Sequence, residues 1–364
     1  MSDQPARIIL SGMSTTELEA LAVQLGEKRF RGRQIAEWLY TRFVRSIDEM
    51  SNLPAPFRAK LNEVAVATSL TIFHKDAAED GTIKYLAQLH DGEEIEAVYL
   101  PYENRVSICI SSQVGCAAGC TFCATAQGGL ARDLTAGEIF EQYLLLANEN
   151  PGRRISHIVY MGMGEPLLNY EAVVGSARLL MQEAGLSARH ITISTVGVVP
   201  GILRLAEEHE PITLAVSLHA PDDVLREQLI PTAKKWKLEQ ILDACKVYHQ
   251  KTKRNLTFEY LLIGGVNDSL LQARDLAKVL GDIPGNVNLI PFNYVDTAQG
   301  FKRPKPDRIQ DFRTTLEVGG RITTQRMERG HGISAACGQL KRTAGTIRVR
   351  NISPKLNVEL TPVG

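Results

Sequence analysis

The sequence predicts an α/β protein: a partial (β/α)6-type barrel preceded by a small helical unit at the N-terminus. Three observations predict this fold. Up to about residue 64, apolar residues recur at helical spacing. From about residue 105, β-branched apolar runs alternate with amphipathic segments. Such alternation implies parallel βαβ units, and about six repeats favour a partial or complete barrel over an open sheet.

The predicted N-terminal domain, residues 1–90, contains three helices and a strand. Apolar residues at intervals of three and four predict helices over 17–26 and 33–44. A third helical segment over 48–64 is interrupted by Pro54 and Pro56. Alternating apolar and polar residues then predict strands over 83–89 and 94–100. We expect this domain to be an accessory to the barrel.

The predicted barrel domain, residues 91–340, holds the repeating units. Strands are expected over 106–110, 155–161, 190–195, 212–218, 256–263, 286–292 and 321–327. Helices are expected between them, over 136–148, 170–184, 200–207, 238–251 and 270–280. Residues 341–364 are expected to form an irregular tail. Functional residues of a barrel cluster at the C-terminal ends of its strands.

Composition excludes several classes of protein. The chain has 364 residues, 44% of them hydrophobic, which excludes disorder throughout and a small disulfide scaffold. Its 41 Lys and Arg balance 41 Asp and Glu, so any affinity for nucleic acid must come from local patches. The N-terminus lacks a secretory signal, and the longest uncharged stretch, 106–131, is too polar to span a membrane. We therefore expect a cytoplasmic protein without membrane contact.

Three of the six cysteines form a compact group, Cys116, Cys120 and Cys123. In a reducing compartment, cysteines at such spacing are more often metal ligands or catalysts than disulfides. Three thiolates can hold an iron–sulfur cube and leave one of its four irons open to a ligand. Zinc is the alternative, but its structural sites normally need a fourth ligand from a second pair of Cys or His, and no such pair follows. Buried, inert thiols are the other alternative.

The CxxxCxxC spacing after the first barrel strand resembles the radical SAM superfamily, in which three cysteines hold a [4Fe–4S] cluster that binds and cleaves S-adenosylmethionine (SAM). Phe122 also fits the aromatic residue usual in that motif. Four segments resemble the RlmN family more closely: QVGCAAGCTFCAT at 113–125, MGMGEPLLN at 161–169, SLHAP at 217–221 and AACGQL at 335–340. The 161–169 segment and the triplet at 291–293 are more similar to RlmN than to its relative Cfr.

The RlmN resemblance implies a radical SAM methyltransferase that methylates C2 of an adenosine in 23S ribosomal RNA and also in transfer RNA. It implies a [4Fe–4S] cluster, two SAM molecules per turnover and a low-potential electron donor. A monomer is expected. The alternatives are a Cfr-like enzyme directed to C8, and a non-catalytic RNA-binding protein in which the cysteines brace the fold.

The resemblance also implies a SAM pocket at the strand ends. Gly164 and Glu165 would bind the methionyl amine, since glycines allow close backbone approach and a carboxylate accepts a hydrogen bond from ammonium. The remaining pocket residues would be Ser194, Ser217, Leu218, His219 and Asn293. Taken singly, residues of these types more often have a structural role.

The residues expected to carry the methyl transfer are Cys337, Cys109 and Glu96. Cys337 lies in a glycine-rich loop suited to an accessible nucleophile. Cys109 lies in a strand, and a buried cysteine in a strand is ordinarily inert. By resemblance, Cys337 is methylated by one SAM, and a second SAM yields the radical that joins its methylene group to the adenine. Cys109 then attacks the Cys337 sulfur, so methylated RNA and a disulfide are released. Glu96 would accept the C2 proton, with Cys109 as the rival base.

Three basic clusters could contact phosphate. The first runs from Lys28 to Arg33 with Arg42 and Arg45, the second is formed by Lys302, Arg303, Lys305 and Arg308, and the third by Lys341, Arg342, Arg348, Arg350 and Lys355. Such runs are usually solvated faces, but three around one active-site mouth would form a rim that contacts RNA. The target adenine would have to be flipped or unstacked to reach a barrel interior.

Overall fold

The computed structural model describes residues 7–208, 210–295, 300–327, 329–330, 332–336 and 338–340. Its centre is one ten-stranded sheet with the order β14-β13-β12-β11-β10-β9-β6-β5-β4-β3. Seven of these strands form the parallel, curved part of the sheet: β6 (Val106–Cys109), β9 (His157–Tyr160), β10 (Ile191–Thr195), β11 (Thr213–Ser217), β12 (Leu256–Leu262), β13 (Gly285–Pro291) and β14 (Thr323–Gln325). The predicted partial β/α barrel is therefore confirmed.

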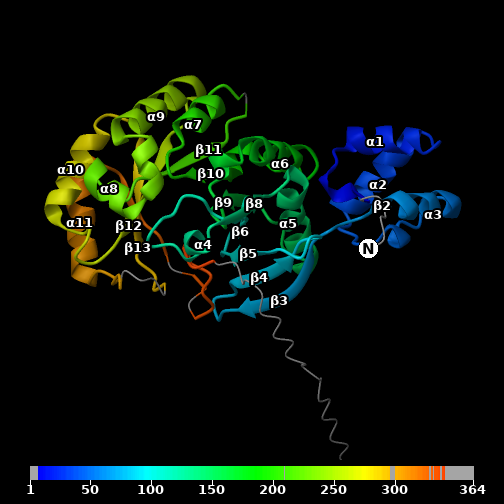
Figure 1. The fold of residues 1–364 in the computed structure, drawn as a ribbon, viewed down its shortest axis with the longest axis horizontal. Helices are drawn as coiled ribbons and strands as arrows, with labels where there is room; N and C mark the ends of the chain where they lie inside the picture. The colour runs from blue at the N-terminus through cyan, green and yellow to red at the C-terminus, as the bar shows by residue number, and fades with distance from the viewer. Residues whose placement is uncertain are drawn as a thin grey trace, which may run out of the picture.

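Helices follow the parallel strands and cover the outside of the barrel (Figure 1). They are α5 (Ala136–Glu149), α6 (Tyr170–Gln182), α7 (Val199–Leu205), α8 (Asp223–Leu229), α9 (Leu238–Thr252), α10 (Leu270–Leu280) and α11 (Pro306–Val318). Their apolar faces pack on a continuous core with the strands. None of the helices in the described ranges is long and apolar enough to cross a membrane.

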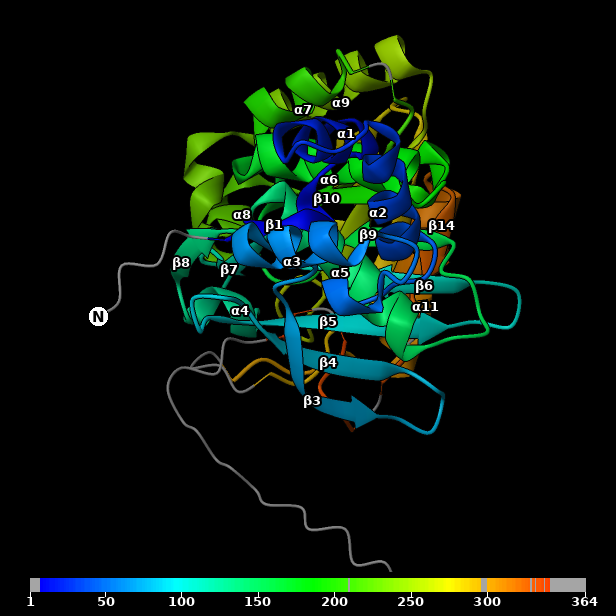
Figure 2. The same ribbon diagram turned by 90° about the vertical axis from the view of Figure 1, so that its right-hand side faces the viewer.

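An antiparallel extension continues the sheet beyond β6. The strands β3 (Thr71–Ala77), β4 (Ile83–Gln88) and β5 (Glu94–Pro101) pair in sequence, and β5 pairs with β6. Figure 2 shows these strands side by side below the barrel. Because β4 pairs with β5, the sheet runs without interruption across residue 90. The domain boundary predicted there remains a prediction.

The N-terminal helices form a separate layer against α5, seen to the right of the barrel in Figure 1. They are α1 (Thr15–Gln24), α2 (Phe30–Tyr40) and α3 (Ala55–Val64), and two short strands, β1 (Ile8–Ile9) and β2 (Ala65–Val66), pair beside them. Ser14 and Glu17 form a reciprocal capping box that starts α1. The third predicted helix begins only after Pro54, since proline is tolerated in the first turn of a helix but not in its interior.

A buried carboxylate fastens this layer to the barrel. Glu141 on α5 accepts hydrogen bonds from Ser69 N at 2.7 Å, Ser69 Oγ at 2.6 Å and Leu70 N at 3.0 Å, and also from Ser11 Oγ. The backbones meet closely here, because a Cβ on Gly12 would lie 2.7 Å from Gly137 Cα. The N-terminal layer and the barrel therefore share a tight, polar interface.

Candidate functional site

The three clustered cysteines lie on a loop that leaves β7 (Gln113–Gly115) and ends in the short helix α4 (Ala124–Gln127). β7 pairs with β8 (Leu130–Asp133), and Cys116 N donates to Gly129 O at 2.9 Å. Gly115 has φ +81°, and a Cβ there would lie 1.9 Å from Gly129 O, so only glycine fits. The loop is thus fixed at both ends before any ligand binds.

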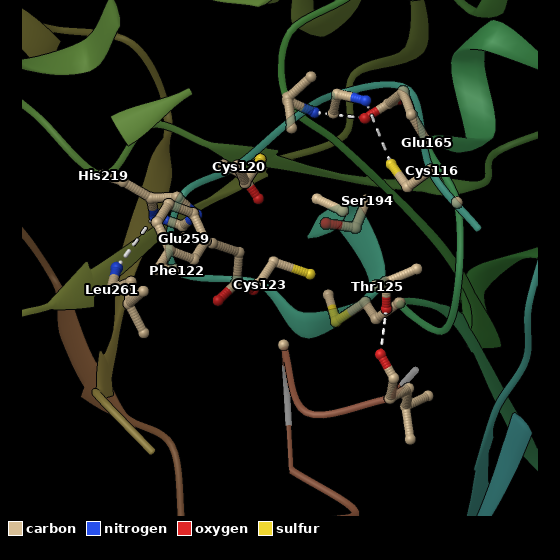
Figure 3. A pocket seen from close by; sticks show the side chains of 18 of the residues that line it. Cys116, Cys120, Phe122, Cys123, Thr125, Glu165, Ser194, His219, Glu259 and Leu261 are labelled. Atoms are coloured by element: carbon tan, nitrogen blue, oxygen red, sulfur yellow. Dashed lines mark hydrogen bonds between the residues drawn. The ribbon is translucent and has the colours of Figure 1, made fainter. Parts of the chain in front are cut away.

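Figure 3 shows the three cysteine side chains around one open space. All three line the same pocket, which also contains Phe122 and the backbone of Gly162 and Gly164. No three His, Cys, Asp or Glu side chains within the described ranges form a group able to hold a single metal ion. A cubane cluster does not require such convergence, because each thiolate binds a different iron.

Burial keeps the thiols of Cys116 and Cys120 neutral in the free protein. It raises the pKa of Cys116 to about 12 and the pKa of Cys120 well above its usual value, and the neighbouring cysteines contribute in the same direction. Neutral thiols are poor nucleophiles, but a bound cation would deprotonate them. These two cysteines are therefore suited to ligate metal and unsuited to attack a substrate.

A buried cation behind the pocket supports this reading. Arg226 is wholly buried, and its Nη2 donates to the carbonyl oxygens of Val196 and Ser217, which both line the pocket. Its Nε and Nη1 have no hydrogen-bond partner. Burial lowers the pKa of Arg226 to about 10, while Cys120, Asp223 and Glu165 raise it. A guanidinium left unsatisfied in this way needs negative charge nearby, and three thiolates on a cluster would supply it.

The loop after β9 forms one wall of the pocket. Gly164 has φ +106°, and a Cβ there would lie 2.6 Å from Ser112 Oγ. The carboxylate of Glu165 accepts from Leu167 N at 3.0 Å and from Val196 N at 2.7 Å. Burial raises the pKa of Glu165 to about 7. A cationic amine entering the pocket would restore its negative charge, as expected for a residue that binds an amino acid.

The opposite wall comes from the ends of β10 to β13. The predicted residues Ser194, Ser217, His219 and Asn293 line the pocket. Leu218 does not, because its side chain is fully buried in the core and its N–H donates to Glu259 O at 3.0 Å.

His219 is held in a defined neutral state. It has φ +62°, which is unusual for a residue other than glycine, and its Nδ1 accepts from Leu261 N at 3.0 Å. Its ring meets Phe122 edge-on, with centroids 5.1 Å apart. Burial, and secondly Arg226, lower the pKa of His219 to about 3. Since Nδ1 is the acceptor, Nε2 carries the proton.

Sequence reasoning did not single out Glu259, whose side chain also lines the pocket. Its Oε2 accepts from Asn288 Nδ2 at 2.8 Å, and burial raises the pKa of Glu259. The signal that could have identified it is a lone carboxylate within the apolar run of β12.

A second pocket adjoins the first and contains Cys109. Its lining includes Arg326 and Ala336, and it shares Met161, Ile290, Asn293 and Leu340 with the first pocket. Cys109 is buried. The structure therefore brings Cys109 next to the cysteine-lined pocket.

Glu96 lies on the same face of the sheet as Cys109. Val98 on β5 is opposite Cys109 on β6, and Glu96 is two residues before Val98. Side chains of opposite residues share a face, as do those two apart on one strand. Glu96 lines neither pocket, but its carboxylate is buried and its N–H contacts Met163 Sδ at 3.4 Å.

Cys337 lies outside the described residues, but segments on both sides of it are placed. Arg329 Nη1 donates to Pro101 O at 2.7 Å, and Gly330 N donates to Asp80 Oδ2 at 3.1 Å, which fastens the segment to the β3–β5 extension. Beyond Cys337, Gly338 O accepts from Ala124 N at 2.7 Å, so this part of the segment contacts the cysteine loop.

The basic clusters differ in what they contact. Arg29 and Arg33 both pair with the buried Glu19, at 2.6 and 2.5 Å, so part of the first cluster stabilises the N-terminal domain itself. From the second cluster, Lys302 and Arg303 line a groove beside the site together with Tyr294, Phe301, Arg329 and Ala336. The third cluster lies outside the described residues.

Comparison with known proteins agrees with this geometry. Residues 110–277 match the model of the radical SAM superfamily, and residues 8–67 match the ribosomal RNA large subunit methyltransferase N-terminal domain. A crystal structure of a radical SAM methyltransferase from Sphaerobacter thermophilus has a TM-score of 0.89 and 44% identity, covering 92% of this chain and 99% of that one.

Two relatives extend the match along the chain. The probable dual-specificity RNA methyltransferase RlmN of Symbiobacterium thermophilum is 48% identical, with 92% of this chain and 91% of the relative covered. The protein of the same name from Nostoc sp. is 46% identical, with 94% and 95% covered. Such identity over almost the whole length shows the family. The chain therefore belongs to the RlmN family of the radical SAM superfamily.

Proposed function

We propose that this protein methylates C2 of adenosine in RNA, in 23S ribosomal RNA and in transfer RNA, through a methylated Cys337. Membership of the family supports RNA methylation by radical SAM chemistry, and both relatives are named as probable dual-specificity RNA methyltransferases. The observation that carries the finer proposal is the shared wall between the cysteine-lined pocket and the pocket of Cys109. A cysteine beside the SAM pocket can act on an intermediate formed there.

Cys116, Cys120 and Cys123 would hold a [4Fe–4S] cluster, which supplies the electron that cleaves SAM when it is bound. Glu165 and the backbone of Gly164 would bind the methionyl amine. Ser194, Ser217, His219 and Asn293 would line the rest of the SAM pocket, with Leu218 contributing only its backbone. Two SAM molecules are used in each turnover, one of them as the source of the methyl group.

The protein's own residues carry the methyl group and release the product. Cys337 holds the carbon as an S-methyl thioether. The radical supplied by the second SAM removes one hydrogen atom from this methyl group, and the carbon then bonds to C2 of the adenine, which joins protein and RNA. The joined species gives up one electron, for which the cluster would be the acceptor. Glu96 accepts the proton from C2. The Cys109 thiolate then attacks the Cys337 sulfur, so an S–S bond forms and the S–C bond breaks. The electron pair of that bond stays with carbon, which takes up a proton and becomes the methyl group of the product.

The groove lined by residues 292–294 and 300–303 on one side, and by Arg329, Ala336 and Gln339 on the other, suits an unstacked nucleotide. Tyr294 has 76% of its surface exposed and could stack on a base, while Lys302, Arg303 and Arg329 supply positive charge beside it. RNA loops with splayed bases are recognised by such aromatic and basic surfaces. The N-terminal domain, residues 1–90, would provide further RNA contacts beside the barrel of residues 91–340, and residues 341–364 would form a tail.

We further propose that the enzyme is cytoplasmic and monomeric and takes electrons from a low-potential donor protein. The main test is the position of the methyl group. Anaerobically reconstituted enzyme, SAM, a reductant and unmodified RNA are incubated, and the RNA is digested to nucleosides for mass spectrometry. The expected product is 2-methyladenosine, absent with Cys116→Ala. Formation of 8-methyladenosine would show a Cfr-like enzyme, and no SAM-dependent deoxyadenosine would indicate a cluster that only braces the fold.

A further inference from the structure

A line of titratable side chains crosses the β3–β5 extension from the interior of the protein to its surface. Asp76 on β3 lies opposite Lys84 on β4, and Lys84 lies opposite Val98 on β5. Glu96 is two residues from Val98, and His74 is two residues from Asp76. Because alternate residues of a strand and opposite residues of a pair share a face, all four titratable side chains lie on one face.

These side chains are in contact from one strand to the next. Lys84 Nζ lies 3.4 Å from Glu96 Oε1 and 3.7 Å from Asp76 Oδ2, and His74 Nε2 lies 2.8 Å from Asp76 Oδ1. Exposure of the side chains rises steadily along the line, from 5% for Glu96 and 10% for Lys84 to 36% for Asp76 and 55% for His74. The line therefore connects a buried carboxylate with solvent.

The buried end of this line lies beside the reactive cysteine. Val98 on β5 is opposite Cys109 on β6, and Cys109 is opposite Val159 on β9. Met161, two residues after Val159, lines both pockets. Cys109 lines the second pocket together with the titratable side chain of Arg326. The face that carries Glu96 and Lys84 is thus continuous with the interior face of the barrel.

A buried lysine at this position needs an explanation. Lysine is rarely buried unless it is paired, and isolated burial of either charge would be costly. An ammonium group near a buried carboxylate favours the ionised form of the acid, which is the form able to accept a proton. Lys84 therefore does more than fill space between β3 and β5.

We propose that Lys84 is a positioning residue for the proton-transfer step, holding Glu96 ionised and passing the accepted proton to solvent through Asp76. This inference rests on the proposed role of Glu96. Once Glu96 has become a carboxylic acid, the Lys84 ammonium gives a proton to the Asp76 carboxylate and takes the Glu96 proton in its place. Lys84 ends with its charge unchanged, Glu96 is again a carboxylate, and Asp76 passes the proton to His74 or water.

The test compares Lys84→Met and Lys84→Arg with wild type and with Lys75→Met. Lys75 is a matched control, because it lies on the neighbouring strand β3, is 59% exposed and pairs only loosely with Glu149, at 3.6 Å. Each variant is reconstituted, and iron content and SAM cleavage confirm that its pocket is intact. The readout is the single-turnover rate of RNA methylation across pH, measured with adenosine carrying hydrogen or deuterium at C2.

For Lys84→Met we expect methylation about tenfold slower or worse, within the range of general-base effects. The acid side of its pH profile should move to higher pH, and its C2 isotope effect should exceed that of wild type. Lys84→Arg should recover most of the rate, because it keeps the charge, and Lys75→Met should behave as wild type. An unchanged rate, profile and isotope effect in Lys84→Met would overturn the inference.

Glu96→Gln separates this inference from the proposed function. If Glu96→Gln is slow while Lys84→Met matches wild type, the role of Lys84 is wrong and the role of Glu96 stands. If Glu96→Gln matches wild type, the proposed proton acceptor is wrong, and the inference fails with it. If Lys84→Met loses iron or SAM cleavage, the proton path is tested with Asp76→Asn, whose side chain is partly exposed. A changed C2 isotope effect in Asp76→Asn supports the proton path, and an unchanged one refutes it.

Discussion

Replacing Glu141 with alanine should separate the N-terminal layer from the barrel and reveal how much that interface contributes. In the wild type the carboxylate accepts from two backbone amides, Ser69 N and Leu70 N, and from the hydroxyls of Ser11 and Ser69. The hydroxyls can turn to other acceptors, but the two amides are fixed by the backbone. An unsatisfied buried donor costs about 1 to 3 kcal/mol, so Glu141→Ala should lower the free energy of unfolding by roughly 2 to 6 kcal/mol.

The assay is urea unfolding of wild type, Glu141→Ala and Glu149→Ala, followed by circular dichroism. Glu149 lies on the same helix, but its pair with Lys75 is mostly solvent-exposed on the lysine side, so its loss should cost at most about 1 kcal/mol. Limited proteolysis should also cut Glu141→Ala faster between residues 65 and 75. If Glu141→Ala is destabilised no more than Glu149→Ala, the reasoning about this interface is refuted.

Three further predictions concern the pocket. Glu165 has a pKa of about 7, above its ordinary value of 4.5, so its contribution to stability is complete below pH 4.5 and is lost as pH rises through about 7. Between roughly pH 5 and pH 8, the free energy of unfolding of the metal-free wild type, measured by urea titration, should therefore fall by about 2 to 3 kcal/mol relative to that of Glu165→Gln. The same pH dependence in both proteins would contradict this. Arg226→Met should bind much less iron on anaerobic reconstitution than Arg226→Lys, which keeps the charge beside the thiolates, whereas equal iron in both would refute a charge role. Tyr294→Ala should weaken RNA binding by about 1 to 3 kcal/mol in filter-binding assays, the usual contribution of one stacked base, with SAM cleavage unchanged; unchanged binding would exclude the groove.

The barrel could be predicted because its signals are local. Most of the parallel strands are short, largely apolar runs, although β14 is polar, and the cysteine motif lies within eight residues. Helix α11 is absent from the prediction, although its buried residues Ile309, Phe312 and Leu316 recur at intervals of three and four. Strand β3 could not be predicted, because it has no buried residue to mark its alternation.

The residues around the pocket depend on register, which the sequence does not reveal. Arg226 occurs in a charged stretch that suggests a solvated helix face, yet it is wholly buried. Lys84 and Glu96 are twelve positions apart, and only the pairing of β4 with β5 brings their charges to 3.4 Å. Short motifs therefore predicted the cysteines that line the pocket. The positions of the charged residues Arg226, Lys84 and Glu96 could be found only from the folded sheet.

The most direct test of the account is the mass of the peptide that contains Cys337, from Cys109→Ala protein produced with its cluster intact and purified anaerobically. In the proposed mechanism, the Cys109 thiolate is the group that displaces the carbon from the Cys337 sulfur. The account predicts that Cys337 carries one additional methylene mass or remains covalently joined to RNA at C2 of an adenine. Unmodified Cys337, with neither state present, would contradict the proposed methyl transfer.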